Sequence, residues 1–261
     1  MLKVRVIPTL LVREVNLVKG PAFDSWRAVG SPMQAVKVFN RRDVDELIIL
    51  DINATPMRSE PDYDQIAILA QECFVPLTVG GGVDSLDCIR KLLHAGADKV
   101  AVNTSAYAEP RFITEAATRF GSQCIVAAVD YRRHPDGRLE CFSHCGTVAT
   151  GRDPLEWAAE LERLGAGEIL LTSIERDGVM QGYDLATIRG VTSAVSIPVI
   201  ASGGAGSYDD MRTAILDAGA TAVAASSMFH FTQQTPAEAK RFLAEAGIPV
   251  RLRFGGAQVA K

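Results

Sequence analysis

The chain has 261 residues, of which 48% are hydrophobic and 22% are charged, and its net charge is -4. This composition is typical of a folded protein with a large core and excludes a disordered chain, while the negative charge argues against a nucleic-acid partner. No apolar run approaches the roughly 20 residues that cross a bilayer, so we expect no membrane partner.

Short apolar, β-branched runs alternate along the chain with segments of helical period. The runs are, in chain order, IPTLLV, ELIILDI, PLTVGGG, KVAVN, CIVAAVD, EILLTSI, PVIASGG and TAVAAS. The helical segments begin at Pro32, Tyr63, Ser85, Pro110, Pro154, Leu185, Ser207 and Pro236. Proline and serine are common at helix starts. The alternation of strand and helix predicts a parallel sheet.

The second half of the chain repeats the first half at an offset of about 120 residues. The corresponding pairs are DELIILDI (45–52) with GEILLTSI (167–174), VPLTVGGG (75–82) with IPVIASGG (197–204), and GADKVAVNTS (96–105) with GATAVAASSM (219–228). A doubly wound open sheet would not ordinarily show this repeat. We therefore predict one (β/α)8 barrel over residues 1–261, composed of half-barrels at about 1–120 and 121–261.

Glycine-rich turns follow the third and the seventh predicted strands, and the next strand in each half ends on small polar residues. The equivalent groups are Gly81, Gly82, Asn103 and Thr104 in the first half, and Gly203, Gly204, Ser226 and Ser227 in the second. Loops after the strands of such a barrel converge on one mouth, where bare backbone N–H groups can approach phosphate oxygens. One such turn alone could be a simple tight connection. The symmetric pair predicts a small ligand with two phosphates.

The remaining signals are weaker. The five cysteines are scattered and odd in number, and the four histidines lack the spacing of metal ligands. We therefore expect reduced thiols, no metal and no cofactor, and the absence of a signal-peptide layout favours a cytoplasmic protein. HPDGR at 134–138 predicts the turn of a hairpin after the fifth strand, and the loop at 13–30 carries Trp26, which could cover a ligand.

These motifs, together with LVKG, TVGGGV, GADKVAVNT, FGSQCIV, RDGVMQGYD, IPVIASGGAG and SSMFHF, resemble the cyclase-subunit family of imidazole glycerol phosphate synthase over nearly the whole chain. In that family a glutaminase partner releases ammonia, which passes through the barrel and meets an open-chain ribulosyl bis-phosphate at the opposite mouth. The resemblance implies an enzyme of histidine biosynthesis, a lyase-type cyclase that works within a glutamine amidotransferase complex.

The resemblance also implies roles for individual residues. The catalytic set comprises Asp130, which is the acid–base carboxylate after the fifth strand, with Lys19, Thr172 and Asp177. Gly178 joins the phosphate-binding residues, and Asp51 and Ser202 match other active-site positions. The implied ammonia gate at the base of the barrel is Arg5, Glu46, Lys99 and Glu168, and Asp98 matches a position that meets the glutaminase. From spacing alone these charges would be solvated surface residues.

One position departs from the family's pattern. Ring closure in the family needs two carboxylates, one after the first strand and one after the fifth, because one group donates a proton while another accepts one. Aligning VRVIPTLLV with CIVAAVD sets Leu11 opposite Asp130. Leucine cannot transfer protons, and Thr9, Leu10 and Val12 are not acids.

Three functions therefore fit the sequence. The first is an ammonia-dependent cyclase in which another acid supports Asp130. The second is a catalytically relaxed paralogue that conducts ammonia for acetamidino-sugar synthesis in lipopolysaccharide assembly, since PMQAVKVFNRRDVDELIILDI and QECFVPL resemble that divergent branch of the family. The third is a sugar-phosphate isomerase of the sister barrel, which also needs a carboxylate where Leu11 stands.

Overall fold

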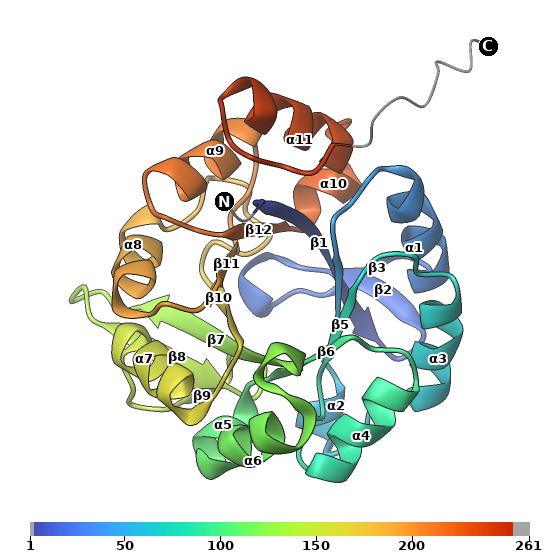
Figure 1. Cartoon of the computed structure of the whole chain (residues 1–261), viewed down its shortest axis with the longest axis vertical. Helices are drawn as coiled ribbons and strands as arrows, with labels where there is room; N and C mark the ends of the chain where they lie inside the picture. Colours follow the sequence, from blue (N-terminus) through green and yellow to red (C-terminus); the bar gives the residue numbers. More distant parts are fainter. Residues whose placement is uncertain (1–2, 253–261) are drawn as a thin grey trace.

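The computed structural model describes residues 3–252 and is a closed barrel of eight parallel strands surrounded by helices (Figure 1). Around the barrel the strands are β1 (Arg5–Arg13), β4 (Leu47–Asp51), β5 (Leu77–Gly80), β6 (Lys99–Val102), β7 (Ile125–Arg133), β10 (Glu168–Ser173), β11 (Val199–Ser202) and β12 (Ala222–Ala225). The parallel pairing of β1 with β12, which aligns Arg5 with Ala222, closes the barrel. The predicted (β/α)8 fold is confirmed.

Helices connect the barrel strands and cover their outer faces (Figure 1). They are α1 (Pro32–Arg41), α3 (Tyr63–Gln71), α4 (Leu86–His94), α6 (Arg111–Phe120), α7 (Pro154–Leu164), α8 (Leu185–Ala194), α9 (Tyr208–Leu216) and α11 (Pro236–Glu245). Each begins within one residue of its predicted start, because side-chain caps or proline define these starts. Ser207, for example, forms a capping box with Asp210. Among residues 3–252 no helix has the length and apolar character to cross a membrane.

Each half-barrel also carries a hairpin after its first strand. The first hairpin (16–30) contains β2 (Asn16–Lys19), the 3-10 turn η1 (Pro21–Phe23) and β3 (Arg27–Gly30), and the second hairpin (139–149) contains β8 (Leu139–Ser143) and β9 (Val148–Ala149). The predicted HPDGR turn joins β7 to β8, with the Gly137 N–H donating to the His134 carbonyl at 2.8 Å. The remaining short helices are α2 (Ala54–Met57), α5 (Thr104–Ala108), η2 (Ser122–Cys124) and α10 (Ser227–Phe231).

The core has two layers. The larger layer lies between the barrel and the helices, and the smaller one fills the barrel axis. The inner layer consists of Ile7, Ile48, Ala101, Val126, Ala128, Leu170, Ile200, Ala222 and Ala224. Because strand side chains alternate between faces, the inward positions of one strand lie at successive depths. The polar residues above and below this apolar layer therefore form two separate groups, one at each end of the axis.

Candidate functional site

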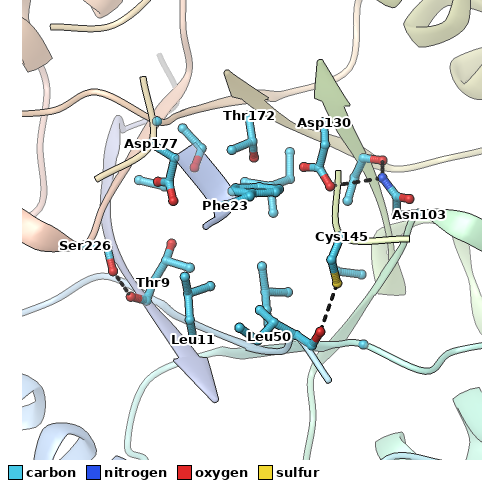
Figure 2. A pocket seen from close by; sticks show the side chains of 18 of the residues that line it. Thr9, Leu11, Phe23, Leu50, Asn103, Asp130, Cys145, Thr172, Asp177 and Ser226 are labelled. Atoms are coloured by element: carbon cyan, nitrogen blue, oxygen red, sulfur yellow. Dashed lines mark hydrogen bonds between the residues drawn. The ribbon is translucent and has the colours of Figure 1, made fainter. Parts of the chain in front are cut away.

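The carboxyl ends of the barrel strands surround a cavity with about 1150 Å³ of empty space, counting the part open to solvent (Figure 2). Every predicted phosphate-binding residue lines it, namely Gly81, Gly82, Asn103, Thr104, Gly178, Gly203, Gly204, Ser226 and Ser227. Asp130, Thr172 and Asp177 line it as well. Lys19 lies behind the wall, where its ammonium group donates a hydrogen bond to the Ser226 hydroxyl.

The two glycine turns have the backbone geometry that only glycine adopts easily. The φ angles are 102° at Gly81 and 68° at Gly82, and 85° at Gly203 and 114° at Gly204. A Cβ atom on Gly81 would lie 2.1 Å from the Asp51 carbonyl oxygen, and one on Gly204 would similarly collide with backbone. Both turns therefore present bare backbone to the cavity from opposite halves of the barrel.

Each glycine turn is accompanied by the polar start of a short helix. Asn103 and Thr104 stand at the start of α5, and Ser226 and Ser227 at the start of α10. The first N–H groups of a helix have no acceptor within the helix, so they are available to a ligand. The Thr104 hydroxyl also accepts a hydrogen bond at 3.0 Å from the backbone N–H of His144 in the second hairpin.

Asp130 lines the cavity as a carboxyl group with a raised pKa. Its carboxylate accepts a hydrogen bond from the Asn103 side-chain amide at 3.2 Å. Burial in the cavity, and secondarily the charge of Asp177, raise the pKa of Asp130 to about 7, while a hydrogen bond from Thr172 opposes the rise. A carboxyl group with a pKa near neutrality can both accept and release a proton under physiological conditions.

Lys19 is buried beside the cavity, and its charge interacts with that of Asp177 in the cavity lining. The Lys19 ammonium donates to the Thr9 carbonyl oxygen at 3.0 Å. Burial lowers the pKa of Lys19 and raises the pKa of Asp177, and the attraction between the two charges opposes both shifts. The pair therefore places a titratable cation next to the Ser226 turn without exposing it on the cavity surface.

Leu11 lies in the cavity wall at the position where the sequence resemblance led us to expect a second carboxylate. Its side chain is 7% exposed, lines the cavity and lies across it from Asp130 (Figure 2). Glu14 is exposed in the turn between β1 and β2, outside the cavity lining. Asp51 does line the cavity, but its carboxylate already accepts the N–H groups of Asn53 and Ala54 at the start of α2. At Leu11 the β1 side of the cavity thus presents hydrocarbon instead of a carboxylate.

The two hairpins fold over the mouth of the cavity. Their position relative to the cavity could not be predicted from the sequence. In the first hairpin the Ala22 N–H donates to the Asp177 carbonyl at 2.8 Å, and Phe23 and Trp26 line the cavity. In the second hairpin the Cys145 thiol donates to the Ile52 carbonyl at 3.1 Å and also faces the cavity. Phe23 and Cys145 were not predicted, because only long-range contacts bring these hairpins to the site.

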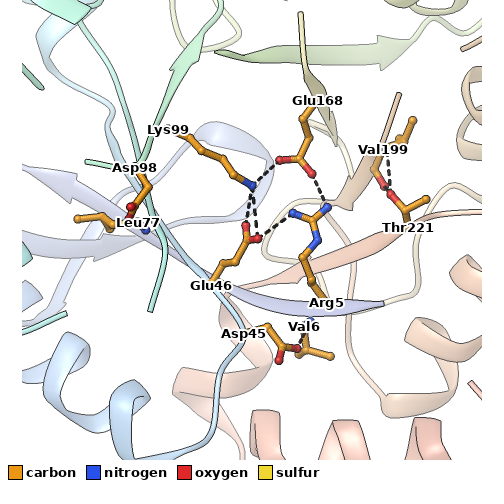
Figure 3. A network of polar contacts seen from close by, with 10 residues as sticks. All are labelled: Arg5, Val6, Asp45, Glu46, Leu77, Asp98, Lys99, Glu168, Val199 and Thr221. Atoms are coloured by element: carbon orange, nitrogen blue, oxygen red, sulfur yellow. Dashed lines mark hydrogen bonds and ion pairs between the residues drawn. The ribbon is translucent and has the colours of Figure 1, made fainter. Parts of the chain in front are cut away.

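The four charged residues at the base form a closed ring of ion pairs (Figure 3). Arg5 contacts Glu46 at 3.0 Å and also Glu168, and Lys99 contacts Glu46 at 3.1 Å and Glu168 at 3.0 Å. The two glutamates are 8% and 5% exposed, so the interpretation of these charges as solvated surface is wrong. Neighbouring Asp98 is exposed and accepts the Leu77 N–H at 2.8 Å.

The segment of the chain that contains the barrel strands, the cavity residues and the charged ring matches a known protein family. A sequence model of the family described as "Histidine biosynthesis protein" matches residues 5–235. The match includes every barrel strand, both glycine turns, the cavity carboxylates and the charged ring, and it ends just before α11. Within residues 3–252, no group of three or more His, Cys, Asp or Glu side chains is arranged to hold a metal ion.

Proposed function

The chain belongs to the histidine biosynthesis protein family, and from this premise we propose that it is the cyclase-type subunit of an ammonia-using synthase with a bis-phosphate ligand. Members of the family are enzymes, and they include both an isomerase and a cyclase on the same barrel. The proposal therefore has to explain which of the two chemistries these residues support.

The charged ring is the observation that carries the proposal. An isomerase needs no passage through its barrel, and four charges paired around the axis are costly to bury unless they serve a purpose. Between the ring and the cavity the axis is filled by the inner core layer, in which four of the nine residues are alanines, namely Ala101, Ala128, Ala222 and Ala224. This arrangement suits a small neutral molecule that enters at the base, and we take ammonia from a glutaminase docked near Asp98 as that molecule.

The paired glycine turns support the second half of the proposal. They face one cavity from opposite half-barrels, and each combines bare backbone with hydroxyl or amide side chains. Such groups bind phosphate oxygens without a large fixed positive charge. A ligand with one phosphate at each turn would place its carbon linker over the cavity floor, next to Asp130 and Thr172.

Asp130 would then move protons at the linker, and Lys19 with Asp177 would supply charge beside the second phosphate. The ammonia nucleophile needs a base to take up its proton, and the pKa of Asp130, raised to about 7, suits that role. The partner acid on the β1 side is missing because of Leu11. A general acid contributes roughly 10²- to 10⁴-fold to a rate, so cyclisation by this chain should be slow by about that factor.

Leu11 favours a second candidate function. A chain that keeps the ring and the axis but lacks one catalytic carboxylate would still deliver ammonia to another synthase. The acetamidino-sugar enzymes of surface-polysaccharide assembly are the expected recipients. In this second function the barrel is an ammonia conduit, and the cavity ligand regulates or completes the path rather than reacting there.

The test is ammonia-dependent turnover of the ribulosyl bis-phosphate by the wild-type chain, Leu11→Asp, Asp130→Asn and the double variant. We expect slow wild-type turnover, a rise of roughly 10²-fold or more in Leu11→Asp, and loss of that gain in the double variant. If wild type already turns over as fast as Leu11→Asp, the conduit function is wrong. If Leu11→Asp remains inactive although it binds the ligand, the cyclase function is wrong and the conduit is favoured.

A further inference from the structure

Thr9 has a buried hydroxyl group with no hydrogen-bond partner among the residues that the structure describes. Thr9 is 7% exposed and lines the cavity, and its side chain points inward beside Leu11 (Figure 2). Buried hydroxyls are nearly always hydrogen-bonded, because an unpaired one loses its bonds to water without replacement. An unpaired hydroxyl at the wall of a ligand cavity therefore indicates that the ligand provides the missing partner.

The internal repeat shows that the polar group on this wall has changed depth. The alignment that pairs Leu11 with Asp130 also pairs Thr9 with Ala128. On β7 the side chains of Asp130 and Ala128 both face the barrel interior, with Asp130 nearer the mouth and Ala128 one step deeper. On β1 the order is reversed, with Leu11 nearer the mouth and Thr9 deeper. The polar group of β1 therefore lies about 7 Å deeper than that of β7, a distance of two residues along a strand. It is also neutral, because a hydroxyl can donate and accept hydrogen bonds but does not ionise here.

The position of Thr9 relative to the second glycine turn narrows the choice of ligand atom. Its carbonyl oxygen accepts hydrogen bonds from the Lys19 ammonium at 3.0 Å and from the Ser226 hydroxyl. Thr9 therefore lies directly beneath the turn where the second phosphate would bind. A ligand atom that reaches its hydroxyl belongs to the carbon linker close to that phosphate, and it needs hydrogen-bonding capacity.

We propose that Thr9 is a specificity-determining residue, which hydrogen-bonds a hydroxyl group on the carbon linker of the ligand and so selects polyhydroxylated bis-phosphates over deoxygenated ones. This inference rests on the proposed bis-phosphate function and adds the chemistry of the linker. Leu11 provides the contrast, since it offers the neighbouring part of the ligand only an apolar surface.

Calorimetric titration with two probes tests this inference on the intact chain. The probes are ribitol bis-phosphate and pentanediol bis-phosphate, which have the same two phosphates but differ in the linker hydroxyls. We expect wild type to bind the ribitol probe more tightly, Thr9→Val to lose roughly 5- to 10-fold of that preference, and Thr9→Ser to keep it. Ser227→Ala, at the phosphate, should weaken both probes to a similar degree.

Thermal unfolding separates recognition from a structural role. Removing an unpaired hydroxyl should leave the Tm of Thr9→Val unchanged or higher. The matched control is Thr187→Val, because Thr187 is also buried but its hydroxyl bonds Asp184 at 2.7 Å and Arg133 at 3.2 Å. That control should lower the Tm and leave the probe preference intact.

The outcomes are distinguishable. If both probes bind and either wild type shows no preference or Thr9→Val keeps it, the inference about Thr9 is overturned while the bis-phosphate proposal stands. A Tm loss in Thr9→Val as large as that in Thr187→Val would assign Thr9 a structural role and also overturn it. If neither probe binds wild type, the bis-phosphate proposal itself fails and this inference fails with it.

Discussion

The protonation of Asp130 couples the cavity to the stability of the barrel. Burial raises its pKa to about 7, whereas an Asp in the unfolded chain titrates near 3.9. Between these two values the folded state binds the proton more tightly than the unfolded state does. This residue therefore reduces stability increasingly as the pH rises through that window, and the full cost is present above about pH 7.

Asp130→Asn should accordingly stabilise the chain, and more so at high pH. We expect its advantage in free energy of unfolding to be about 1–2 kcal/mol larger at pH 8 than at pH 5, allowing for the water that reaches the cavity. Urea denaturation of both proteins at the two pH values measures this difference. An advantage that does not vary with pH would mean that the pKa of Asp130 is not raised.

The residue scale also shows where sequence reasoning works and where it stops. The glycines of both turns were predictable, because a repeated motif with a backbone requirement leaves few other residues possible. Asp130 was predictable from the resemblance, and the missing partner at Leu11 from the resemblance together with the internal repeat. The inward position of Lys19 was not, because it depends on hydrogen bonds to Thr9 and Ser226 that join distant parts of the chain.

Among the elements, the glycine turns are the parts of the site that tolerate substitution least. Gly204→Ala would force a side chain onto a φ of 114° and place its Cβ 2.2 Å from the Gly182 carbonyl oxygen. We expect a loss of about 2–4 kcal/mol in the free energy of unfolding, combining backbone strain with displacement of the neighbouring loop.

Gly137→Ala is the matched control for that substitution. Gly137 has a φ of 89°, but a Cβ there would meet nothing within 4 Å. Its cost should be limited to the strain of the left-handed backbone, about 1 kcal/mol. Chemical denaturation compares the two variants, and equal losses would show that the φ angle, rather than the close approach of two backbone segments, makes glycine necessary at 204.

The hairpins illustrate the limit of prediction at the element scale. The HPDGR turn was predictable, because local residues determine it. The closure of the first hairpin over the cavity was not, since it depends on the bond between Ala22 and Asp177 and on left-handed φ angles of 50° and 60° at Ala22 and Phe23. Those angles are uncommon for residues with side chains, and local sequence does not signal them.

At the scale of the whole molecule, the repeat made the fold predictable. Two similar halves with alternating strands and helices leave few topologies other than a barrel, and the helix starts followed from proline and capping residues. The location of the ring was predictable only in part. Four charges near strand starts indicate the base of the barrel, but their mutual pairing depends on the register that brings Arg5, Lys99 and the two glutamates to the same level of the axis.

In the proposed function the ring is the entrance for ammonia that reaches the cavity at the other end, so its disruption should separate two activities. Glu168→Gln removes one carboxylate and leaves Arg5 and Lys99 sharing Glu46. Because the glutamates are buried and the cations are partly exposed, we expect a loss of about 1–3 kcal/mol in the free energy of unfolding.

The effect of Glu168→Gln on turnover distinguishes a ring that admits ammonia from one that only stabilises the fold. If ammonia passes through the ring, Glu168→Gln should lower the turnover that depends on glutamine and the glutaminase, while turnover with free ammonium salts stays within about twofold of wild type. Lys91→Gln removes a cation from a solvent-exposed pair with Glu60 and Asp87 and should change neither rate. Parallel losses with glutamine and with ammonium in Glu168→Gln would instead show that the ring only supports the cavity, and ammonia would then have to reach Asp130 by another route.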